Sequence, residues 1–319
     1  MSPTVPAVPP ASDPSRGSRT AAELATQPEC WLRAVRDHAD FAAALPRRGE
    51  RVAVTGCGTS WFMAQAYAAL REAAGEGNTD AFAASEFPAG RAYDRVVAIT
   101  RSGTTTEVLD LLGALRVAGP GTPLVALTAD PSSPVLRSAP HVAVLDYADE
   151  TSVVQTRFAT TALALLRAGL PGGEAAVTRA AGEAEAALEK ALPEAVVEAE
   201  QWTFLGRGWC YGLAQEAALK MRESAGAWTE AYPSMEYRHG PVSIAAAGRV
   251  VWVFGDAPQG LDAEVRRAGA VFAPGAGIDP MARLVLAQRL AVAVAGARGL
   301  DADRPRNLTR SVILSEPTV

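Results

Sequence analysis

The chain has 319 residues, of which 49% are hydrophobic and 20% charged, and its formal net charge is −5. This length accommodates two domains, and the acidic balance argues against a nucleic-acid partner, which usually meets a basic face. The three cysteines, Cys30, Cys57 and Cys210, are widely spaced without a CxxC pair, which indicates reduced thiols and no metal site. No apolar run reaches membrane-spanning length and the N-terminus lacks the apolar core of a secretory signal, so we expect a cytoplasmic protein with no membrane partner.

Strand and helix patterns alternate along the chain. The Pro- and Ser-rich residues 1–20 are expected to form a flexible tail. A first unit, residues 21–171, opens with a helical pattern and closes with an Ala-rich helix that begins near residue 151. Its strands are expected at residues 51–56, 81–85, 95–100, 123–128 and 141–145.

Residues 172–200 are acidic and Ala-rich and predict a helical connector. In the second unit, residues 201–300, helices are expected at 211–225 and 280–298, and strands at 202–205, 249–254 and 270–273. Residues 301–319 are a closing tail. Strands that alternate with helices predict parallel sheets, so the expected fold is α/β with two flavodoxin-like domains.

Two strand-to-helix turns of the first unit are rich in hydroxyls and glycine: CGTS at residues 57–60 and TRSGTTT at residues 100–106. The free N–H groups and the dipole at such helix starts favour an anion, and glycine lets the backbone approach it. Neither turn is a P-loop or a GxGxxG motif, so no nucleotide is indicated. Ordinary N-capping by Ser and Thr is the alternative for either turn alone.

One face of the helix at residues 211–225 carries Glu216, Lys220 and Glu223, spaced i, i+4 and i+7. A solvated stripe of helix salt bridges is the simplest interpretation of this spacing. However, Lys220 is one of only two lysines among 30 basic residues, which suggests that a compact ammonium is needed there. His239, one of three histidines, follows in the loop EYRHGP at residues 236–241.

These segments together resemble the double-SIS phosphosugar isomerase family, in particular the isomerase half of glutamine–fructose-6-phosphate aminotransferase (glucosamine-6-phosphate synthase). That family has a GRG turn, an E-x-x-L-K-x-x-E helix and an E-x-x-H-G-P loop in this order, after G-T-S and S-x-S-G-x-[ST] turns. The segment ETSVVQTR, residues 150–157, is similar to its sugar-covering segment E-x-x-V-x-x-T-[KR]. The resemblance covers about residues 21–315 and implies two SIS domains, one in each unit.

The resemblance also implies residue roles. Glu223 would shuttle the proton between C1 and C2, His239 would open the sugar ring, and Lys220 and Glu216 would orient hydroxyls. The phosphate and the sugar would be bound by Gly58, Thr59, Ser60, Thr100, Arg101, Ser102, Thr104, Thr105, Val153 and Thr156. Thr100 and Arg101 depart from the synthase, which has Ser and Gln at these two positions.

The closing segment departs from the synthase at Arg310, where the family has the lysine that forms a Schiff base with its sugar. A guanidinium stays protonated and cannot form an imine. No glutaminase domain is expected either, so glutamine-dependent aminotransferase activity is not expected. The sequence favours an enzyme without cofactors, a phosphosugar isomerase and specifically an aminosugar-6-phosphate deaminase of the glucosamine-6-phosphate type.

Three alternatives remain open from the sequence: an aldose–ketose isomerase of a neutral sugar phosphate, a deglycase, or a non-catalytic SIS sensor of phosphosugars. The sensor is disfavoured because only about fifty residues precede the first strand, fewer than a DNA-binding domain needs. By resemblance we expect a homodimer with shared active sites, in which the histidine loop reaches the neighbouring subunit.

Overall fold

The computed structural model describes residues 18–88, 90–119 and 121–314. Its first sheet is entirely parallel, with strand order β2-β1-β3-β4-β5, the order of flavodoxin-like folds. The strands are β1 (Val52–Gly56), β2 (Thr79–Ala83), β3 (Arg95–Ile99), β4 (Leu124–Thr128) and β5 (His141–Val144). The central three, β1, β3 and β4, are buried along their whole length, as near-continuous apolar runs require in a parallel sheet covered on both faces.

The second sheet is parallel as well, with order β7-β6-β8-β9. Its strands are β6 (Gln201–Gly206), β7 (Trp228–Pro233), β8 (Arg249–Phe254) and β9 (Val271–Ala273). The sequence did not predict β7, which carries Glu230 and ends on Pro233. Both residues are tolerated because β7 is an edge strand and only partly buried.

Eleven α-helices occur among the described residues. They are α1 (Arg19–Ala25), α2 (Gln27–Asp37), α3 (Thr59–Ala73), α4 (Thr106–Ala118), α5 (Val135–Ser138), α6 (Arg157–Ala168), α7 (Gly173–Glu189), α8 (Glu194–Val197), α9 (Cys210–Ala225), α10 (Leu261–Arg267) and α11 (Pro280–Ala297). Short 3-10 helices span His38–Phe41, Ala84–Glu86, Asp146–Ala148, Glu236–Arg238 and Pro241–Ile244.

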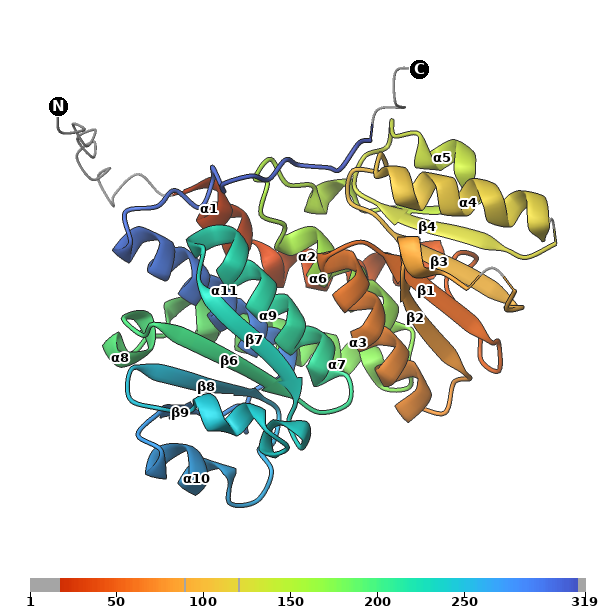
Figure 1. The fold of residues 1–319 in the computed structure, drawn as a ribbon. Helices are drawn as coiled ribbons and strands as arrows, with labels where there is room; N and C mark the ends of the chain where they lie inside the picture. Colours follow the sequence, from red (N-terminus) through yellow and green to blue (C-terminus); the bar gives the residue numbers. More distant parts are fainter. Residues whose placement is uncertain (1–17, 89, 120, 315–319) are drawn as a thin grey trace, which may run out of the picture.

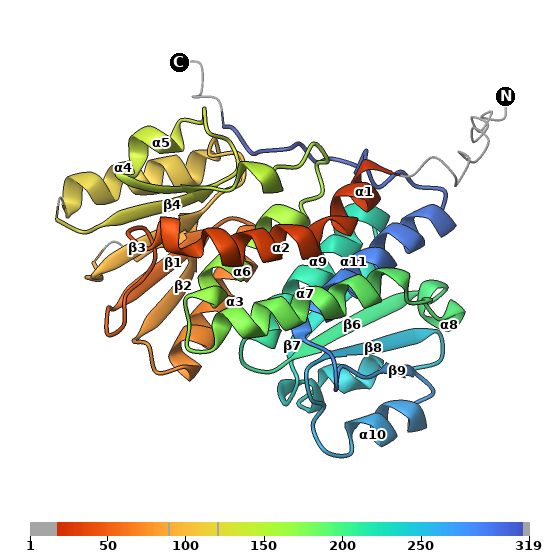
Figure 2. The same cartoon turned by 180° about the vertical axis from the view of Figure 1, so that it is seen from behind.

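Long helices fill the space between the two sheets (Figures 1 and 2). Helix α3 packs on α9, α2 on α6 and α7, and α11 on α9 and α7, so one hydrophobic core runs through both halves of the molecule. Gly212 makes the α3–α9 contact possible, because a Cβ there would lie 2.5 Å from the Phe62 carbonyl oxygen. The expected α/β architecture of two parallel sheets flanked by helices is confirmed.

Three boundaries differ from expectation. Helix α1 begins at Arg19 and buries Thr20, inside the predicted flexible tail, whose residues 1–17 lie outside the described residues. The helix expected from residue 151 begins only at Arg157, because the preceding segment is a loop organised by a buried carboxylate. The predicted connector is mainly α7, whose Ala-rich face is buried in the shared core and links the two halves by packing.

Helix α11 is long and apolar enough, by length and composition alone, to span a membrane, although Arg283 and Arg289 interrupt its apolar residues. It is nevertheless 67% buried inside the protein, where it packs against α9, α7 and α1. It is therefore the core helix of the second half.

Candidate active site

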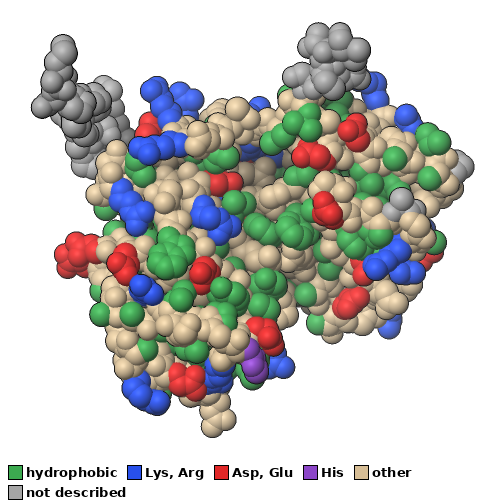
Figure 3. Space-filling model, viewed as in Figure 1, with side chains coloured by type: hydrophobic (Ala, Val, Ile, Leu, Met, Phe, Trp, Pro, Cys, Tyr) green, Lys and Arg blue, Asp and Glu red, His purple; other side chains and the backbone are tan. Residues whose placement is uncertain are grey.

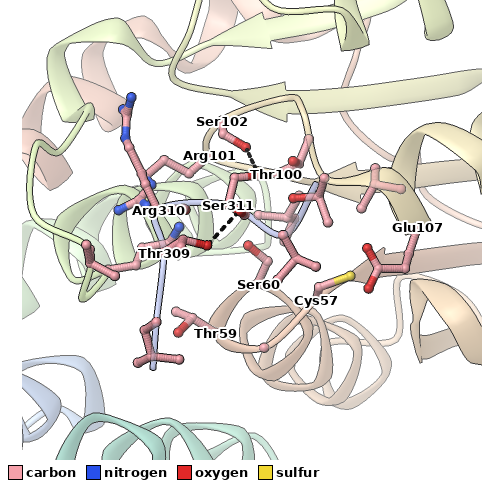
Figure 4. Close-up of a pocket in the computed structure, with 18 of the residues that line it drawn as sticks. Cys57, Thr59, Ser60, Thr100, Arg101, Ser102, Glu107, Thr309, Arg310 and Ser311 are labelled. Carbon is pink, nitrogen blue, oxygen red and sulfur yellow. Dashed lines mark hydrogen bonds between the residues drawn. The ribbon is translucent and has the colours of Figure 1, made fainter. Parts of the chain in front are cut away.

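A cavity of about 210 Å³ opens at the carboxyl ends of β1 and β3, where α3 and α4 begin (Figure 4). The strand order reverses between these two strands, which is the position where open parallel sheets bind ligands. Both predicted turns meet here, although 40 residues of chain separate Ser60 from Thr100.

Glycines shape the floor of the cavity. A Cβ at Gly56 would lie 2.7 Å from the Ser60 Cβ and 2.9 Å from the Ile99 carbonyl oxygen, so only glycine lets β1 turn so tightly into α3. Gly58 precedes α3 with φ of 54°, a left-handed value that glycine adopts without strain. As a result Thr59 and Ser60 lie in the first turn of α3 and line the cavity.

The second turn supplies two buried polar residues, Thr100 and Arg101, to the lining of the cavity. Thr100 is only 4% exposed, and its hydroxyl has no hydrogen-bond partner within the described residues. Arg101 is equally buried and its Nε also lacks a partner there, while its other nitrogens donate to the Ser152 carbonyl (3.0 Å) and the Arg310 carbonyl (2.8 Å). Burial lowers the Arg101 pKa and Glu150 opposes that shift, and an arginine keeps its charge at any working pH. These two residues offer an anion a hydroxyl and a cation.

Residues 150–157, the segment that the resemblance places over a sugar, are held by a buried carboxylate. Glu150 accepts hydrogen bonds from the backbone N–H and hydroxyl of Thr156 (2.6 and 2.7 Å) and from the N–H of Arg157 (2.8 Å). Thr156 is therefore committed to Glu150 and does not line the cavity, contrary to the sugar-binding role expected for it. Val153 does line the cavity, as expected.

Helix α9 brings an acidic group to the opposite wall. Glu223 lines the cavity and accepts a hydrogen bond from Lys220. The Lys220 Nζ also lies 3.5 Å from the Glu216 Oε1, and both of these side chains are 1% exposed. The stripe predicted from spacing is therefore buried, and the solvated interpretation is wrong for Glu216 and Lys220.

Burial and charge set the protonation of this group. Burial raises the pKa of Glu216 to about 8; Lys220 opposes the shift and Glu223 adds to it. The Thr59 hydroxyl and the Lys220 ammonium, 3.5 Å from the Glu216 Oε1, act to lower that pKa, but burial outweighs them. For Lys220, burial acts to lower the pKa, but Glu216 and Glu223 outweigh it and raise that pKa above its ordinary value. Lys220 is thus an ammonium that holds Glu223 in place.

Four further predicted residues do not line the cavity: Glu216 and Lys220, which are buried on α9, and His239 and Thr104. His239 is exposed in the loop after Glu236–Arg238 and does not line the cavity in this protomer. Thr104 does not line the cavity, but its hydroxyl donates a hydrogen bond (2.9 Å) to the hydroxyl of Ser102, which does. The remaining predicted ligands, Gly58, Thr59, Ser60, Thr100, Arg101, Ser102, Thr105 and Val153, are brought together by the fold.

Sequence reasoning missed several lining residues. Cys57 and Glu107 lie side by side at one end of the cavity (Figure 4), and burial followed by the Glu107 charge raises the Cys57 pKa. Glu107 directly follows the hydroxyl-rich turn and could have been found by its position. Residues 308–312 of the closing segment also line the cavity; the resemblance marks only Arg310 among them as a residue near the sugar.

The described residues contain no group of three or more His, Cys, Asp or Glu side chains placed to hold a metal ion. Acidic and basic side chains are interspersed on the face of the molecule seen in Figure 3. That face therefore presents no basic stripe of the kind that nucleic acids require.

Comparison with known proteins agrees with this geometry. The model of the SIS domain family matches residues 47–168, whereas a second SIS domain at residues 201–300 stays a prediction. The glutamine–fructose-6-phosphate aminotransferase (isomerizing) of Methanothermobacter thermautotrophicus is 30% identical over 308 residues, which cover 82% of this chain and 51% of that protein. The chain spans about half the length of the curated relatives it matches.

Solved structures share the fold over nearly the whole chain. Glucosamine-6-phosphate deaminase from Thermotoga maritima has a TM-score of 0.77 at 23% identity and covers 93% of this chain and 100% of its own. Tagatose-6-phosphate ketose/aldose isomerase from Escherichia coli has a TM-score of 0.78 at 20% identity and covers 97% of this chain and 99% of its own. At these identities the likeness establishes the architecture. Together with the family match, it shows that residues 47–168 are a SIS domain within a chain similar to part of an isomerizing aminotransferase.

Proposed function

We propose that this protein is an enzyme that binds a 6-phosphorylated amino sugar in the cavity, isomerises it between C1 and C2, and releases ammonia. One observation carries the proposal: a cradle for an anion and the Glu223 carboxylate, held by Lys220, line the same small cavity. The similar proteins named above act, by their names, on 6-phosphates of fructose, glucosamine or tagatose.

The cradle suits a phosphate monoester. The starts of α3 and α4 lie at the cavity, where the helix dipole favours an anion, and Ser60, Ser102 and Thr105 add hydroxyl groups around them. Arg101 lines the cavity and contributes a cation, and charge-assisted hydrogen bonds are stronger than neutral ones. The unpartnered Thr100 hydroxyl supplies a further donor at the same edge.

The proton transfer would fall to Glu223, the acidic side chain on the opposite wall. With the phosphate in the cradle, the other end of the sugar extends towards α9, where a carboxylate can remove the C2 proton and return it to C1. For an amino sugar this converts the aldehyde and C2 amine into a C1 alcohol and a C2 imine. Water then adds to C2 and ammonia leaves, so one amino sugar phosphate and one water give one ketose phosphate and one ammonia.

An imine between enzyme and sugar is not part of the proposal. Arg310 lines the cavity where a lysine would be needed, and its guanidinium is bonded to Asp149 at 2.6 Å. Lys220 is buried and kept protonated by two carboxyl groups, so it is not a free amine. Transfer of ammonia from glutamine through a sugar–enzyme imine is therefore not the reaction that this site supports.

The location of His239 leads to a proposal about assembly. The side chain is exposed and outside its own cavity, so a ring-opening role requires a second copy of the chain that inserts this loop beside Glu223. We therefore propose a homodimer with shared active sites. Mixing His239→Ala and Glu223→Gln chains should restore part of the activity that each variant lacks alone, whereas a monomer would show no complementation.

The function is tested by ammonia release from glucosamine and galactosamine 6-phosphates without glutamine. Glu223→Gln should lower turnover about 10²- to 10⁴-fold, the usual contribution of a general base, while sugar phosphate binding is retained. The control Glu185→Gln changes an exposed glutamate on α7 and should leave activity intact.

The other outcomes each select a rival function. Ketose formation from neutral sugar phosphates without ammonia would make the protein an aldose–ketose isomerase. Ammonia or amine release only from sugar–amino-acid phosphates would make it a deglycase. Binding without turnover in wild type and variant alike would make it a sensor.

A further inference from the structure

The closing segment, residues 301–314, forms a strap that runs from the second half of the molecule to the first. In Figure 1 it is the dark blue trace along the top, from beside α1 towards α4 and α5. At its start Asp303 accepts hydrogen bonds from the backbone N–H groups of Arg19 (2.7 Å) and Thr20 (2.8 Å). Near its end the Leu314 N–H donates to the Thr106 hydroxyl at 2.9 Å. The strap is thus fixed at both ends.

Between these anchors Ser311 enters the anion cradle. Its hydroxyl lies 3.1 Å from the Ser102 hydroxyl and 3.0 Å from the Thr104 hydroxyl, and these two are 2.9 Å apart. The three oxygens form a triangle at the start of α4, and Ser102 and Ser311 both line the cavity (Figure 4). A segment more than 200 residues away in sequence therefore adds a hydroxyl to the loop that would hold the phosphate.

We propose that Ser311 is a direct ligand of the bound phosphate, so that the strap completes the cradle. This rests on the proposed function for the identity of the anion. The strap is already in place while about 210 Å³ remains open beneath it, a volume equal to about seven waters at about 30 Å³ each. A phosphate group can therefore occupy the cavity without displacing the strap, and it would draw the three hydroxyl hydrogens towards itself.

A second contact couples the strap to the same anion. Arg101 donates to the Arg310 carbonyl at 2.8 Å and also lines the cavity. The Arg310 guanidinium in turn bonds Asp149 at 2.6 Å, so the residue before Ser311 is held from both sides. An anion bound to both Arg101 and Ser311 would hold two adjacent strap residues, Arg310 through Arg101 and Ser311 directly. Anion binding should therefore order the strap.

One contact favours the opposite role, in which the strap competes with the anion. The Val312 carbonyl accepts a hydrogen bond from the Thr106 N–H (3.3 Å), a donor at the start of α4 that an anion could use. This contact occupies one donor, while Ser60, Ser102 and Thr105 still line the cavity. Completion of the cradle is thus the arrangement that more of the contacts support.

The test measures binding of inorganic phosphate to the full chain by calorimetry. Ser311→Ala should weaken it about ten- to hundredfold, the factor that one hydrogen bond to a charged group contributes, and Ser311→Thr should restore it. Asp149→Asn, which loosens the strap but keeps the Ser311 hydroxyl, should have a much smaller effect. Thr178→Ala, which removes an exposed hydroxyl on α7, should have none. Phosphate should also slow amide hydrogen exchange of residues 308–314 in the wild type.

Unchanged phosphate affinity of Ser311→Ala, with the wild type binding phosphate and turning over substrate, would overturn this proposal and leave the function intact. Tighter binding by Ser311→Ala would show that the strap competes with the anion, which overturns it as well. Equal losses in Asp149→Asn and Ser311→Ala would reduce Ser311 to an anchor of the strap. A wild type that binds neither inorganic phosphate nor sugar phosphates would overturn both proposals.

Discussion

Glu216→Gln should change how the stability of this protein depends on pH. Glu216 is buried on α9, and its pKa is raised from 4.5 to about 8. Between these two values the unfolded chain has released the Glu216 proton and the folded chain still holds it. Folding therefore becomes less favourable as pH rises through this window, and the stability present below pH 4.5 is lost.

The magnitude follows from the width of the window. Each unit of pKa difference corresponds to about 1.4 kcal/mol, so a shift from 4.5 to about 8 corresponds to at most about 5 kcal/mol at pH 8. Glutamine has nearly the same shape and no charge at any pH, so the variant should lack this slope. Relative to wild type, the variant should gain several kcal/mol of unfolding free energy between pH 5 and pH 8.

Urea denaturation at pH 5, 6.5 and 8 measures the effect, provided that the m-value is the same for both proteins. Glu185→Gln, an exposed substitution on α7, is the matched control and should show no comparable gain. A difference between Glu216→Gln and wild type that stays constant from pH 5 to pH 8 would refute the reasoning. Glu216 would then ionise in its ordinary range, and the Lys220 ammonium would be compensated by two carboxylates.

Two further substitutions test the packing that builds the site and joins the halves. Gly56→Ala should lower the free energy of unfolding by about 1–3 kcal/mol and weaken phosphate binding, because the new Cβ would lie 2.7 Å from the Ser60 Cβ. The control Gly182→Ala adds a Cβ with nothing within 4 Å and should instead stabilise helix α7. Similar urea midpoints for the two variants would contradict this prediction. Arg167→Met should cost about 3–5 kcal/mol, because it strands the buried Asp279, whose carboxylate Arg167 holds at 2.7 and 3.0 Å. The control Arg179→Met breaks the surface ion pair with Glu183 and should lower the free energy of unfolding by at most about 1 kcal/mol. An equally small loss for Arg167→Met would show that the ion pair between α6 and the start of α11 contributes little to stability.

Local pattern was sufficient for the central strands and for both turns of the cradle. The runs at β1, β3 and β4 are continuous and apolar, as strands buried on both faces must be, and they were predicted within one residue or two. Hydroxyls and glycine directly after such strands indicate an anion site, because the helix that follows must expose its first N–H groups. The same reasoning failed for β7, where edge position permits polar residues and a terminal proline that local pattern assigns to a loop.

The sequence by itself determined the α/β class, the two hydroxyl-rich turns and the spacing of Glu216, Lys220 and Glu223, since each depends on neighbours within a few turns of chain. Only the tertiary structure decided that this stripe is buried, because the exposure of a charged helix face depends on which other elements pack against the helix. It also placed the strap, and with it Ser311, beside Ser102, and it left His239 outside the cavity. Those outcomes depend on contacts between segments far apart in the sequence, which no local pattern encodes.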